Sequence, residues 1–309
     1  MINVRSVVPL VVLALSTLAG AAVEDDSPAT APLPVRIERG ITYATRGKET
    51  LKLDLAMPKE GGPYPAVVLL HGGAWQLGSR TELSRGGKDA AGKPSPALIE
   101  TVAAHGYVVA SVSYRFAPKY KFPSQLEDTR TAIRFLRANA TTYHLDPTRV
   151  GVGGFSAGGH LALLAGLADK APEFDGTDFP DQSDRVQCVV SFFGPTDLSL
   201  YGASPGLEDA YMVPLLGKEC RTDPAVYRRA SPIHHVSRGD PPVLMIHGTA
   251  DLIVPIIHSE RLLAKLRETE VTSELITVKG KGHGWEGPTA AKTIQDALRF
   301  LDVHLKGKK

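Results

Sequence analysis

Unbroken apolar runs, separated by stretches with helical periodicity, restrict the fold of this chain more than any other feature. The runs occupy residues 65–70, 107–112, 150–153, 186–193 and 243–246. A strand with one face in water alternates apolar and polar side chains, whereas a strand covered on both faces is apolar throughout. The pattern therefore predicts one α/β domain, in which a mostly parallel central sheet carries helices on both faces.

The other predicted elements fit the same alternation. Two early strands are predicted at residues 36–45 and 51–57, and a late strand at 274–278. Helices are predicted after Ser156 and at residues 97–105, 124–140, 259–267 and 294–305. Ser124 and Glu127 have the spacing of a capping box, which favours a helix start at Ser124. The sequence contains no internal repeat, so these elements are expected to form a single domain.

Two segments do not follow this alternation. Residues 78–96 are rich in Gly, Ser and Lys and are predicted to form a loop. Residues 198–232 carry scattered Gly, Pro and Asp, and we interpret them as a small insertion after the sixth strand rather than a second domain. The insertion is either a surface excursion or a cap over the functional site.

The first 22 residues are predicted to be a signal peptide. Arg5 supplies the positive start, residues 7–18 are mostly apolar, and residues 19–22 are the small residues typical of a cleavage site. The apolar run is shorter than the ~20 residues that cross a bilayer, and Pro9 interrupts it. We therefore expect a secreted or periplasmic protein without a stable membrane span.

After cleavage, the mature chain is expected to begin with a flexible linker at residues 23–35 and to continue as one catalytic domain at residues 36–309. Cys188 and Cys220 are its only cysteines, and an oxidising compartment allows them to form a disulfide. Cys188, however, lies within the apolar run at 186–193, where a free thiol packs as a small hydrophobic group. Both interpretations stay open.

The segment Gly154-Phe155-Ser156-Ala157-Gly158 matches a turn that presents a nucleophilic serine. A glycine two positions to either side lets a strand turn sharply into a helix, with the serine at the apex. The motif alone is weak evidence, but here it follows the apolar run at 150–153 and precedes a helical run at 160–164. Ser156 is therefore the predicted nucleophile.

His71-Gly72-Gly73-Ala74-Trp75 follows another apolar run and suits an oxyanion-binding loop. Acyl transfer passes through a tetrahedral oxyanion, which backbone N–H groups stabilise, and small residues let the backbone approach the substrate. The N–H of Ala157, directly after the nucleophile, is a further predicted donor. His71 is expected to hold the loop rather than to take part in the reaction.

A base and an orienting acid follow in the order expected for such a site. His283 lies among glycines after the strand at 274–278, and Asp251 lies on the loop after the run at 243–246. We predict that His283 is the general base and that Asp251 orients it. Asp197 also follows an apolar run and is the alternative acid. No His or Cys pair has metal-ligand spacing, so neither a metal nor a cofactor is expected.

Together these motifs resemble the α/β-hydrolase esterases related to hormone-sensitive lipase, especially the bacterial feruloyl and acetyl-xylan esterase-like branch. The motifs His-Gly-Gly-x-Trp, Gly-x-Ser-Ala-Gly-Gly-His-Leu, Gly-Pro-Thr-Asp-Leu, His-Gly-x-x-Asp and Gly-x-Gly-His-Gly occur in the family's order over residues 36–305. The resemblance implies the α/β-hydrolase fold, with Gly73 and Ala74 as oxyanion donors. Trp75, which ends the first motif, is the predicted substrate-binding residue. Residues 78–96 look longer than usual, so the pocket rim is expected to differ.

The resulting prediction is a secreted serine carboxylic-ester hydrolase with a Ser156–His283–Asp251 triad and an acyl-enzyme intermediate. The resemblance implies short-chain acyl, acetyl or feruloyl esters, either as small molecules or linked to polysaccharide. The first motif also resembles kynurenine formamidases, so an N-formyl amide hydrolase is the alternative enzyme, and a catalytically silent binding module is the alternative outside enzymes. A formal net charge of +2, from 35 basic and 33 acidic residues, gives no reason to expect nucleic acid as a partner.

Overall fold

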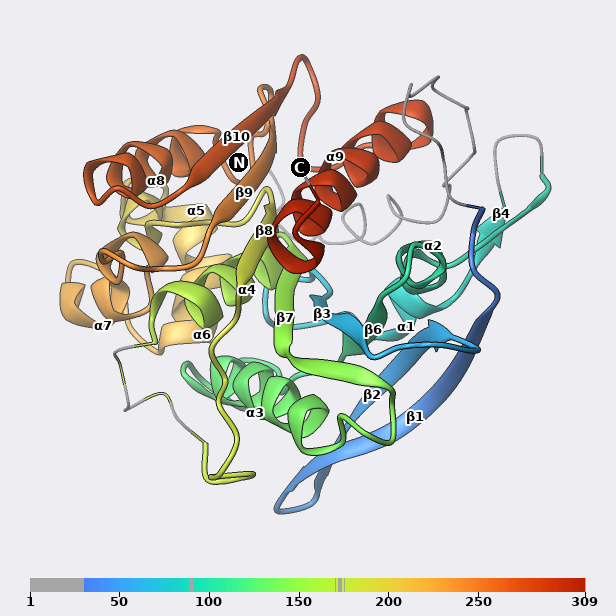
Figure 1. Ribbon diagram of the computed structural model, residues 1–309. Coiled ribbons are helices and arrows are strands. Elements are labelled where there is room, and N and C mark those ends of the chain that lie inside the picture. The colour runs from blue at the N-terminus through green and yellow to red at the C-terminus, as the bar shows by residue number, and fades with distance from the viewer. Residues whose placement is uncertain (1–30, 89–91, 170, 172–173, 175, 309) are drawn as a thin grey trace.

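An eight-stranded sheet forms the centre of the computed structural model, which describes residues 31–88, 92–169, 171, 174 and 176–308 (Figure 1). In sheet order the strands are β1 (Val35–Arg46), β2 (Glu49–Pro58), β6 (Val108–Val112), β3 (Tyr64–Leu70), β7 (Leu145–Phe155), β8 (Cys188–Phe192), β9 (Val243–Gly248) and β10 (Ser273–Val278). The strands β1, β2 and β6 pair antiparallel, and every pair from β6 to β10 is parallel. The predicted mostly parallel sheet is confirmed, and the architecture is the α/β-hydrolase fold.

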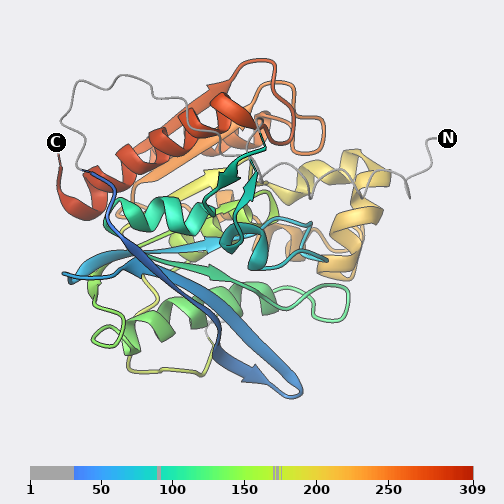
Figure 2. The same ribbon diagram turned by 90° about the vertical axis from the view of Figure 1, so that its right-hand side faces the viewer.

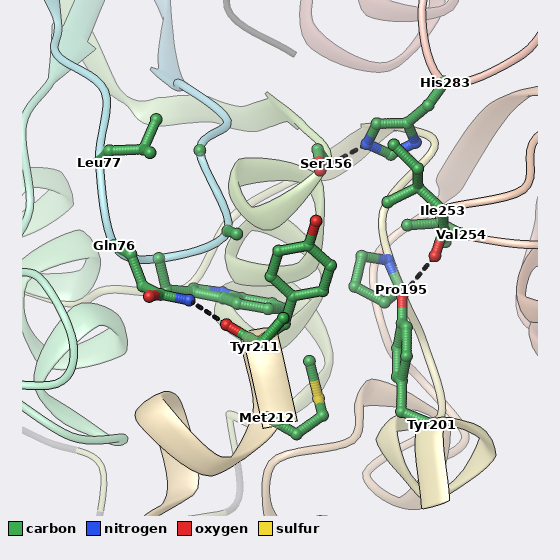
Figure 3. Close-up of a pocket in the computed structure, with 14 residues that line it drawn as sticks. Gln76, Leu77, Ser156, Pro195, Tyr201, Tyr211, Met212, Ile253, Val254 and His283 are labelled. Carbon is green, nitrogen blue, oxygen red and sulfur yellow. Dashed lines mark hydrogen bonds between the residues drawn. The ribbon is translucent and has the colours of Figure 1, made fainter. Parts of the chain in front are cut away.

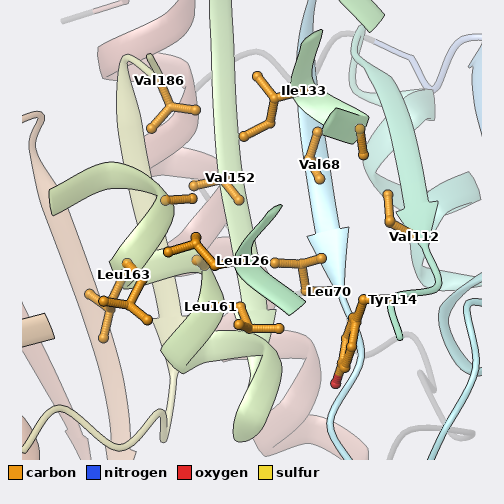
Figure 4. Packing of buried hydrophobic residues seen from close by; sticks show 14 of the residues in the cluster. Val68, Leu70, Val112, Tyr114, Leu126, Ile133, Val152, Leu161, Leu163 and Val186 are labelled. Carbon is orange, nitrogen blue, oxygen red and sulfur yellow. The ribbon is translucent and has the colours of Figure 1, made fainter. Parts of the chain in front are cut away.

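Helices cover both faces of the sheet (Figure 2). One face packs on α3 (Ser124–Ala138), α4 (Ala157–Leu167) and α8 (Ile257–Glu268), the other on α2 (Leu98–Ala104) and α9 (Gly287–Lys306). Successive residues of a strand point to opposite faces, so Val68 and Leu70 lie in the first core while Val67 and Leu69 lie in the second. Burial on both faces explains why β3 is apolar throughout. Figure 4 shows the first of these cores, where side chains of β3, β7, α3 and α4 interlock.

Three details differ from the sequence predictions. Helix α9 begins at Gly287, seven residues before the predicted start, with a proline in its first turn, where the missing N–H costs nothing. Helix α3 does begin at Ser124, but its N-cap is Pro123 and no capping box forms. Glu127 instead pairs with Arg115, at 2.9 Å, so a tertiary ion pair takes the side chain that local spacing had assigned to the cap.

The segment 78–96 is more structured than the predicted loop. It contains the short helix α1 (Thr81–Ser84) and a two-stranded hairpin of β4 (Gly87–Lys88) and β5 (Pro94–Ser95). Nε of Arg80 lies 2.8 Å from Oδ1 of the buried Asp54, which ties the start of this segment to β2. The segment is thus anchored to the sheet where it leaves the loop after β3.

The insertion between β8 and β9 is confirmed as a small helical excursion after the sixth strand of the main sheet. Its elements are η4 (Leu198–Ala203), α5 (Pro205–Leu207), the π-helical turn η5 (Glu208–Met212), α6 (Val213–Leu216), α7 (Pro224–Arg229) and η6 (Pro232–His234). Inside it, the Tyr227 hydroxyl and the N–H of Cys220 donate to Oε1 of the buried Glu208, at 2.7 and 2.6 Å. The insertion is therefore internally braced rather than an extended loop.

The N-terminal segments, the two cysteines and the predicted absence of a membrane span can each be compared with the structure. The predicted signal peptide at residues 1–22 lies outside the described residues, and β1 begins at Val35, at the end of the predicted linker. Cys188 and Cys220 are both free thiols, and Cys188 is fully buried in β8. Among the described residues, no helix combines the length and apolar character that a bilayer crossing requires.

Candidate active site

Ser156 stands at the sharp turn from β7 into α4, in a strained backbone conformation. Its φ of 54° and ψ of −118° lie in a region that non-glycine residues rarely adopt. A Cβ atom on Gly154 would lie 2.4 Å from the carbonyl carbon of Gly158, and one on Gly158 would lie 2.2 Å from the carbonyl oxygen of Leu70. The turn therefore requires both glycines, for the reason that the motif suggested.

His283 contacts Ser156 and Asp251 through its two ring nitrogens. Nε2 of His283 lies 2.8 Å from Oγ of Ser156, as Figure 3 shows, and Nδ1 lies 2.7 Å from Oδ2 of Asp251. The side chains of His283 and Asp251 are 5% and 0% exposed, so water competes little for these hydrogen bonds. The structure thus brings together the three side chains that the sequence singled out as nucleophile, base and acid.

Asp251 and His283 lie side by side because they follow neighbouring parallel strands, β9 and β10. The N–H of Ala250 donates to the Lys281 carbonyl at 2.8 Å, which joins the two loops directly. A Cβ atom on Gly248 would lie 2.4 Å from that same carbonyl oxygen, so the loop that carries the histidine can approach β9 only at a glycine. Strand order therefore selects the acid.

The carboxylate of Asp251 is fully bonded. Oδ1 accepts the N–H groups of Ile253 and Val254, both at 2.9 Å, while Oδ2 lies 3.4 Å from Nε2 of His247 and also accepts from His283. Burial acts to raise the pKa of Asp251, but the hydrogen bonds from the two histidines outweigh it and hold that pKa well below its usual range. An ionised carboxylate fixes the proton of His283 on Nδ1 and leaves Nε2 free to accept from Ser156.

The loop after β3 exposes backbone N–H groups beside the serine. Gly73, Ala74 and Trp75 have φ values of 103°, 53° and 60°, and such successive positive φ values turn N–H groups toward one side. Within the described part of the chain, neither Gly73 nor Ala74 donates its N–H to another residue. Ala157 is the first residue of α4, where an N–H has no partner within the helix.

Gly73, Ala74 and Ser156 border a small, mostly apolar cavity of about 100 Å³. One wall is the loop after β3, a second is the loop after β9, and a third is the insertion (Figure 3). The lining residues are Gly73, Ala74, Trp75, Gln76, Leu77, Ser156, Pro195, Tyr201, Ala210, Tyr211, Met212, Ile253, Val254 and His283. The insertion is therefore part of the site and not a distant surface excursion.

Two side-chain hydrogen bonds join the loop after β3 to its surroundings. Nε2 of Gln76 donates to the Ala210 carbonyl of the insertion at 2.8 Å. Nε1 of Trp75 donates to Nδ1 of His160 at 3.2 Å, and Nε2 of that buried histidine lies 2.7 Å from the Ala230 carbonyl. Trp75, the predicted substrate-binding residue, thus lines the cavity with its ring and uses its N–H to anchor the loop.

Asp197, the alternative acid, is occupied elsewhere. Its Oδ1 accepts the N–H and hydroxyl of Ser199, at 3.2 and 2.5 Å, and its Oδ2 lies 2.9 Å from Nη1 of Arg261. It therefore caps η4 and ties the insertion to α8, and it makes no hydrogen bond with His283.

Sequence reasoning missed most of the cavity wall. Tyr201, Tyr211 and Met212 come from the insertion, where no motif marks them, although π-helical turns such as η5 often occur at functional sites. Ile253 and Val254 lie two and three residues after Asp251, so their position beside the site was readable once that aspartate was chosen. In the described part of the chain, no three His, Cys, Asp or Glu side chains gather in a way that could hold a metal ion.

Comparison with known proteins places this geometry in context. A model of the BD-FAE family matches residues 53–266, which include Ser156 and Asp251. Esterase LipC of Mycobacterium tuberculosis (strain ATCC 25618 / H37Rv) is 34% identical over 242 residues, which make up 74% of this chain and 56% of that protein. This chain spans about half the length of the curated relatives that it matches first, at 56%, 46% and 52%.

Two solved structures are similar over nearly their whole length. A truncated carbohydrate esterase from gut microbiota has a TM-score of 0.72 and 27% identity, with 89% of this chain and 99% of that chain covered. The esterase Est2 of Thermogutta terrifontis, solved with propionate bound, has a TM-score of 0.67 and 25% identity, covering 85% and 91%. The chain therefore matches nearly the whole length of both solved esterase chains.

The two aspartates provide the first prediction. Asp251→Asn should lower kcat by on the order of 10³- to 10⁴-fold with little change in KM, because an amide favours the wrong tautomer of His283. Asp197→Asn is the matched control, and it should lower the melting temperature or change KM while largely retaining kcat. Steady-state kinetics and thermal unfolding of both variants measure this. If the two kinetic profiles were exchanged, Asp197 would be the acid.

Proposed function

This chain belongs to the BD-FAE family of α/β-hydrolase esterases, and from that premise we propose that it hydrolyses carboxylic esters at Ser156. The observation that carries the proposal is the continuous contact from Ser156 through His283 to the buried, fully bonded carboxylate of Asp251. The unpaired N–H groups of the loop after β3, which borders the same cavity, support it further.

In the proposed first half-reaction, Oγ of Ser156 bonds to the ester carbonyl carbon while Nε2 of His283 takes the hydroxyl proton. The carbonyl π electrons move to oxygen and form an oxyanion. The N–H groups of Gly73, Ala74 and Ala157 stabilise this charge, in a site where little reorganisation is needed during the reaction. The carboxylate of Asp251 stabilises the imidazolium that results.

The second stage releases the products. The oxyanion collapses, the bond to the alcohol oxygen breaks, and His283 gives its proton to that oxygen, which leaves an acyl group on Ser156. Water then attacks the acyl carbon while His283 takes its proton, and the same steps in reverse release the acid and restore the serine hydroxyl. No metal or cofactor enters the proposed mechanism.

We propose short acyl groups, acetyl to butyryl, as the preferred substrates. The cavity beside Ser156 measures about 100 Å³, below the ~300 to 1,000 Å³ typical of sites for drug-sized ligands. The rings of Tyr211 and Tyr201 and the side chain of Met212 limit it on the side of the insertion (Figure 3). Such a cavity favours acetyl over feruloyl among the acyl groups considered, and the alcohol, small or polysaccharide-linked, would remain outside.

We also propose that the protein is secreted or periplasmic. The support is the sequence alone, with a positive start at Arg5, an apolar run, and small residues up to Ala22. N-terminal sequencing of the protein recovered from a bacterial periplasm or culture medium should find Val23 as the first residue. Retention of the leader on membrane-bound protein would contradict this proposal.

Replacement of the nucleophile tests the reaction itself. Ser156→Ala should abolish hydrolysis of p-nitrophenyl acetate, with a loss on the order of 10⁴-fold or more, because no other group can form the acyl intermediate. Ser183→Ala, which removes an exposed hydroxyl on the loop before β8, should retain full activity. Activity of Ser156→Ala within tenfold of the parent would refute the assignment. Hydrolysis of an N-formyl amide without hydrolysis of any ester would favour a formamidase.

Chain-length preference tests the role of the cavity. Among p-nitrophenyl esters, kcat/KM should be highest for acetyl to butyryl and fall sharply for octanoyl. Tyr211→Ala enlarges the cavity and should shift the optimum toward longer chains. Tyr143→Ala should leave the profile unchanged, because Tyr143 precedes β7, at the opposite end of that strand from Ser156. A clear preference of the parent enzyme for octanoyl would contradict the proposed substrate class.

A further inference from the structure

A tyrosine behind the loop after β3 directs its buried hydroxyl at two carbonyl groups of this loop. Tyr114 follows β6 and is 2% exposed. Its hydroxyl lies 3.0 Å from the carbonyl oxygen of His71 and 3.2 Å from that of Gly72. Its ring stacks on the imidazole of His71, with centroids 4.5 Å apart and planes within 10°. Tyr114 therefore supports two consecutive residues of the loop at the same time.

The Gly72 carbonyl matters because it shares a peptide unit with the N–H of Gly73. A peptide unit is planar, so a group that fixes the carbonyl also fixes the direction of the N–H at its other end. The carbonyl of Gly72 also accepts from Nδ1 of His71, at 2.8 Å. Two side chains thus hold this peptide plane from behind, and accepted hydrogen bonds polarise the N–H that faces the cavity.

The other two candidate donors are held differently. The peptide unit that carries the N–H of Ala74 is fixed at the Gly73 carbonyl, which accepts the N–H groups of Gln76 and Leu77 at 3.0 and 3.1 Å. The peptide unit of Ala157 is fixed at the Ser156 carbonyl, which accepts from the backbone of α4. Only the peptide before Gly73 is held by side chains rather than by the backbone. Of the three peptide units, the one before Gly73 is therefore the one whose orientation a single side-chain substitution can change.

His71, the other side chain that holds this peptide, is itself positioned by Tyr114. Burial lowers the pKa of His71 to about 4, so its ring is neutral and carries one proton, which it donates to Gly72. The other ring nitrogen, Nε2, is buried and has no hydrogen-bond partner among the described residues. The ring is instead held by its stack on Tyr114 and by an edge contact with Phe116, with centroids 5.9 Å apart. Tyr114 thus acts on the Gly72 carbonyl twice. Its hydroxyl donates to that carbonyl, and its ring holds the imidazole of His71, which donates to the same carbonyl.

On the side opposite Tyr114, the loop after β3 packs directly against α4. A Cβ atom on Gly158 would lie 2.2 Å from the Leu70 carbonyl oxygen and 2.5 Å from that of His71, so α4 already touches the end of β3. The loop is therefore enclosed between α4 and Tyr114.

From these contacts we infer that Tyr114 is a positioning residue, whose hydroxyl and ring aim the N–H of Gly73 at the oxyanion. The inference rests on the proposed ester hydrolysis and assigns a function to a residue outside the cavity. A donor that points correctly only when the tyrosine is present stabilises the transition state and not the bound ester. Loss of the hydroxyl should therefore reduce kcat without affecting KM.

Tyr114→Phe tests the inference, because phenylalanine retains the stack on His71 and removes only the hydroxyl. We expect kcat for p-nitrophenyl acetate to fall about 10- to 100-fold at unchanged KM, less than the ~10²- to 10³-fold that the loss of a whole oxyanion donor costs. The affinity for an alkyl boronic acid, whose tetrahedral adduct on the serine imitates the transition state, should weaken by a similar factor. A product analogue such as butyrate should bind as before.

Tyr107→Phe is the matched control. The Tyr107 hydroxyl is also buried and donates one short hydrogen bond, at 2.6 Å, but to Asp302 of α9, away from the site. Both variants should lose similar stability, and only Tyr114→Phe should lose kcat and boronate affinity. Equal kinetic behaviour of the two variants would overturn the inference and leave the proposed ester hydrolysis intact.

A second variant and the parent enzyme keep the inference testable. If Tyr114→Phe does not unfold cooperatively, His71→Phe takes its place, because it keeps the stack but removes the Nδ1 donor to the same carbonyl, and it should show the same loss of kcat and boronate affinity. If the parent enzyme neither hydrolyses an ester nor binds the boronic acid, the proposed function is refuted, and the inference is refuted with it.

Discussion

The strained turn at Ser156 is the constraint on which the rest of the site depends. A positive φ at a non-glycine residue costs roughly 1–3 kcal/mol and persists only where the surroundings determine it fully. Here β7 lies in the centre of the sheet, and α4, buried along its whole length, packs against it. Gly154 and Gly158 let strand, helix and the end of β3 come closer than any side chain would allow. The rigid core therefore holds a conformation that an exposed loop could not maintain.

The parallel sheet supplies the remaining groups because its strands end at one edge. The loop after β3 brings backbone N–H groups, the loop after β9 brings Asp251, and the loop after β10 brings His283. Each loop is held by its own hydrogen bonds, and these bonds fix the distances between the reactive atoms. The buried carboxylate of Asp251 illustrates this, since the N–H groups of Ile253 and Val254 and the ring of His283 all donate to it, and the ring of His247 lies 3.4 Å away.

Chemistry and selectivity come from different parts of the chain. The reactive groups stand on strand ends, whereas Tyr201, Tyr211 and Met212 of the insertion close the cavity. The Gln76–Ala210 hydrogen bond links the two parts directly, between the loop that faces the oxyanion and the insertion that limits the substrate. Glu208 accepts hydrogen bonds from Cys220 and Tyr227 inside the insertion. A substitution in the cavity wall of the insertion can therefore change the cavity without displacing the reactive groups.

The sequence by itself determined the features that depend on neighbouring residues. Apolar runs marked buried strands, the glycines around Ser156 marked a turn that only they permit, and a histidine among glycines after a strand marked the loop of the base. The sequence favoured Asp251 over Asp197 as the acid, but each follows a strand, and the tertiary structure decided between them because it brings only Asp251 of the two to His283. It also took Glu127 from its expected cap and placed Tyr114 behind Gly72, since both contacts join residues that the fold, and not the local spacing, brings together.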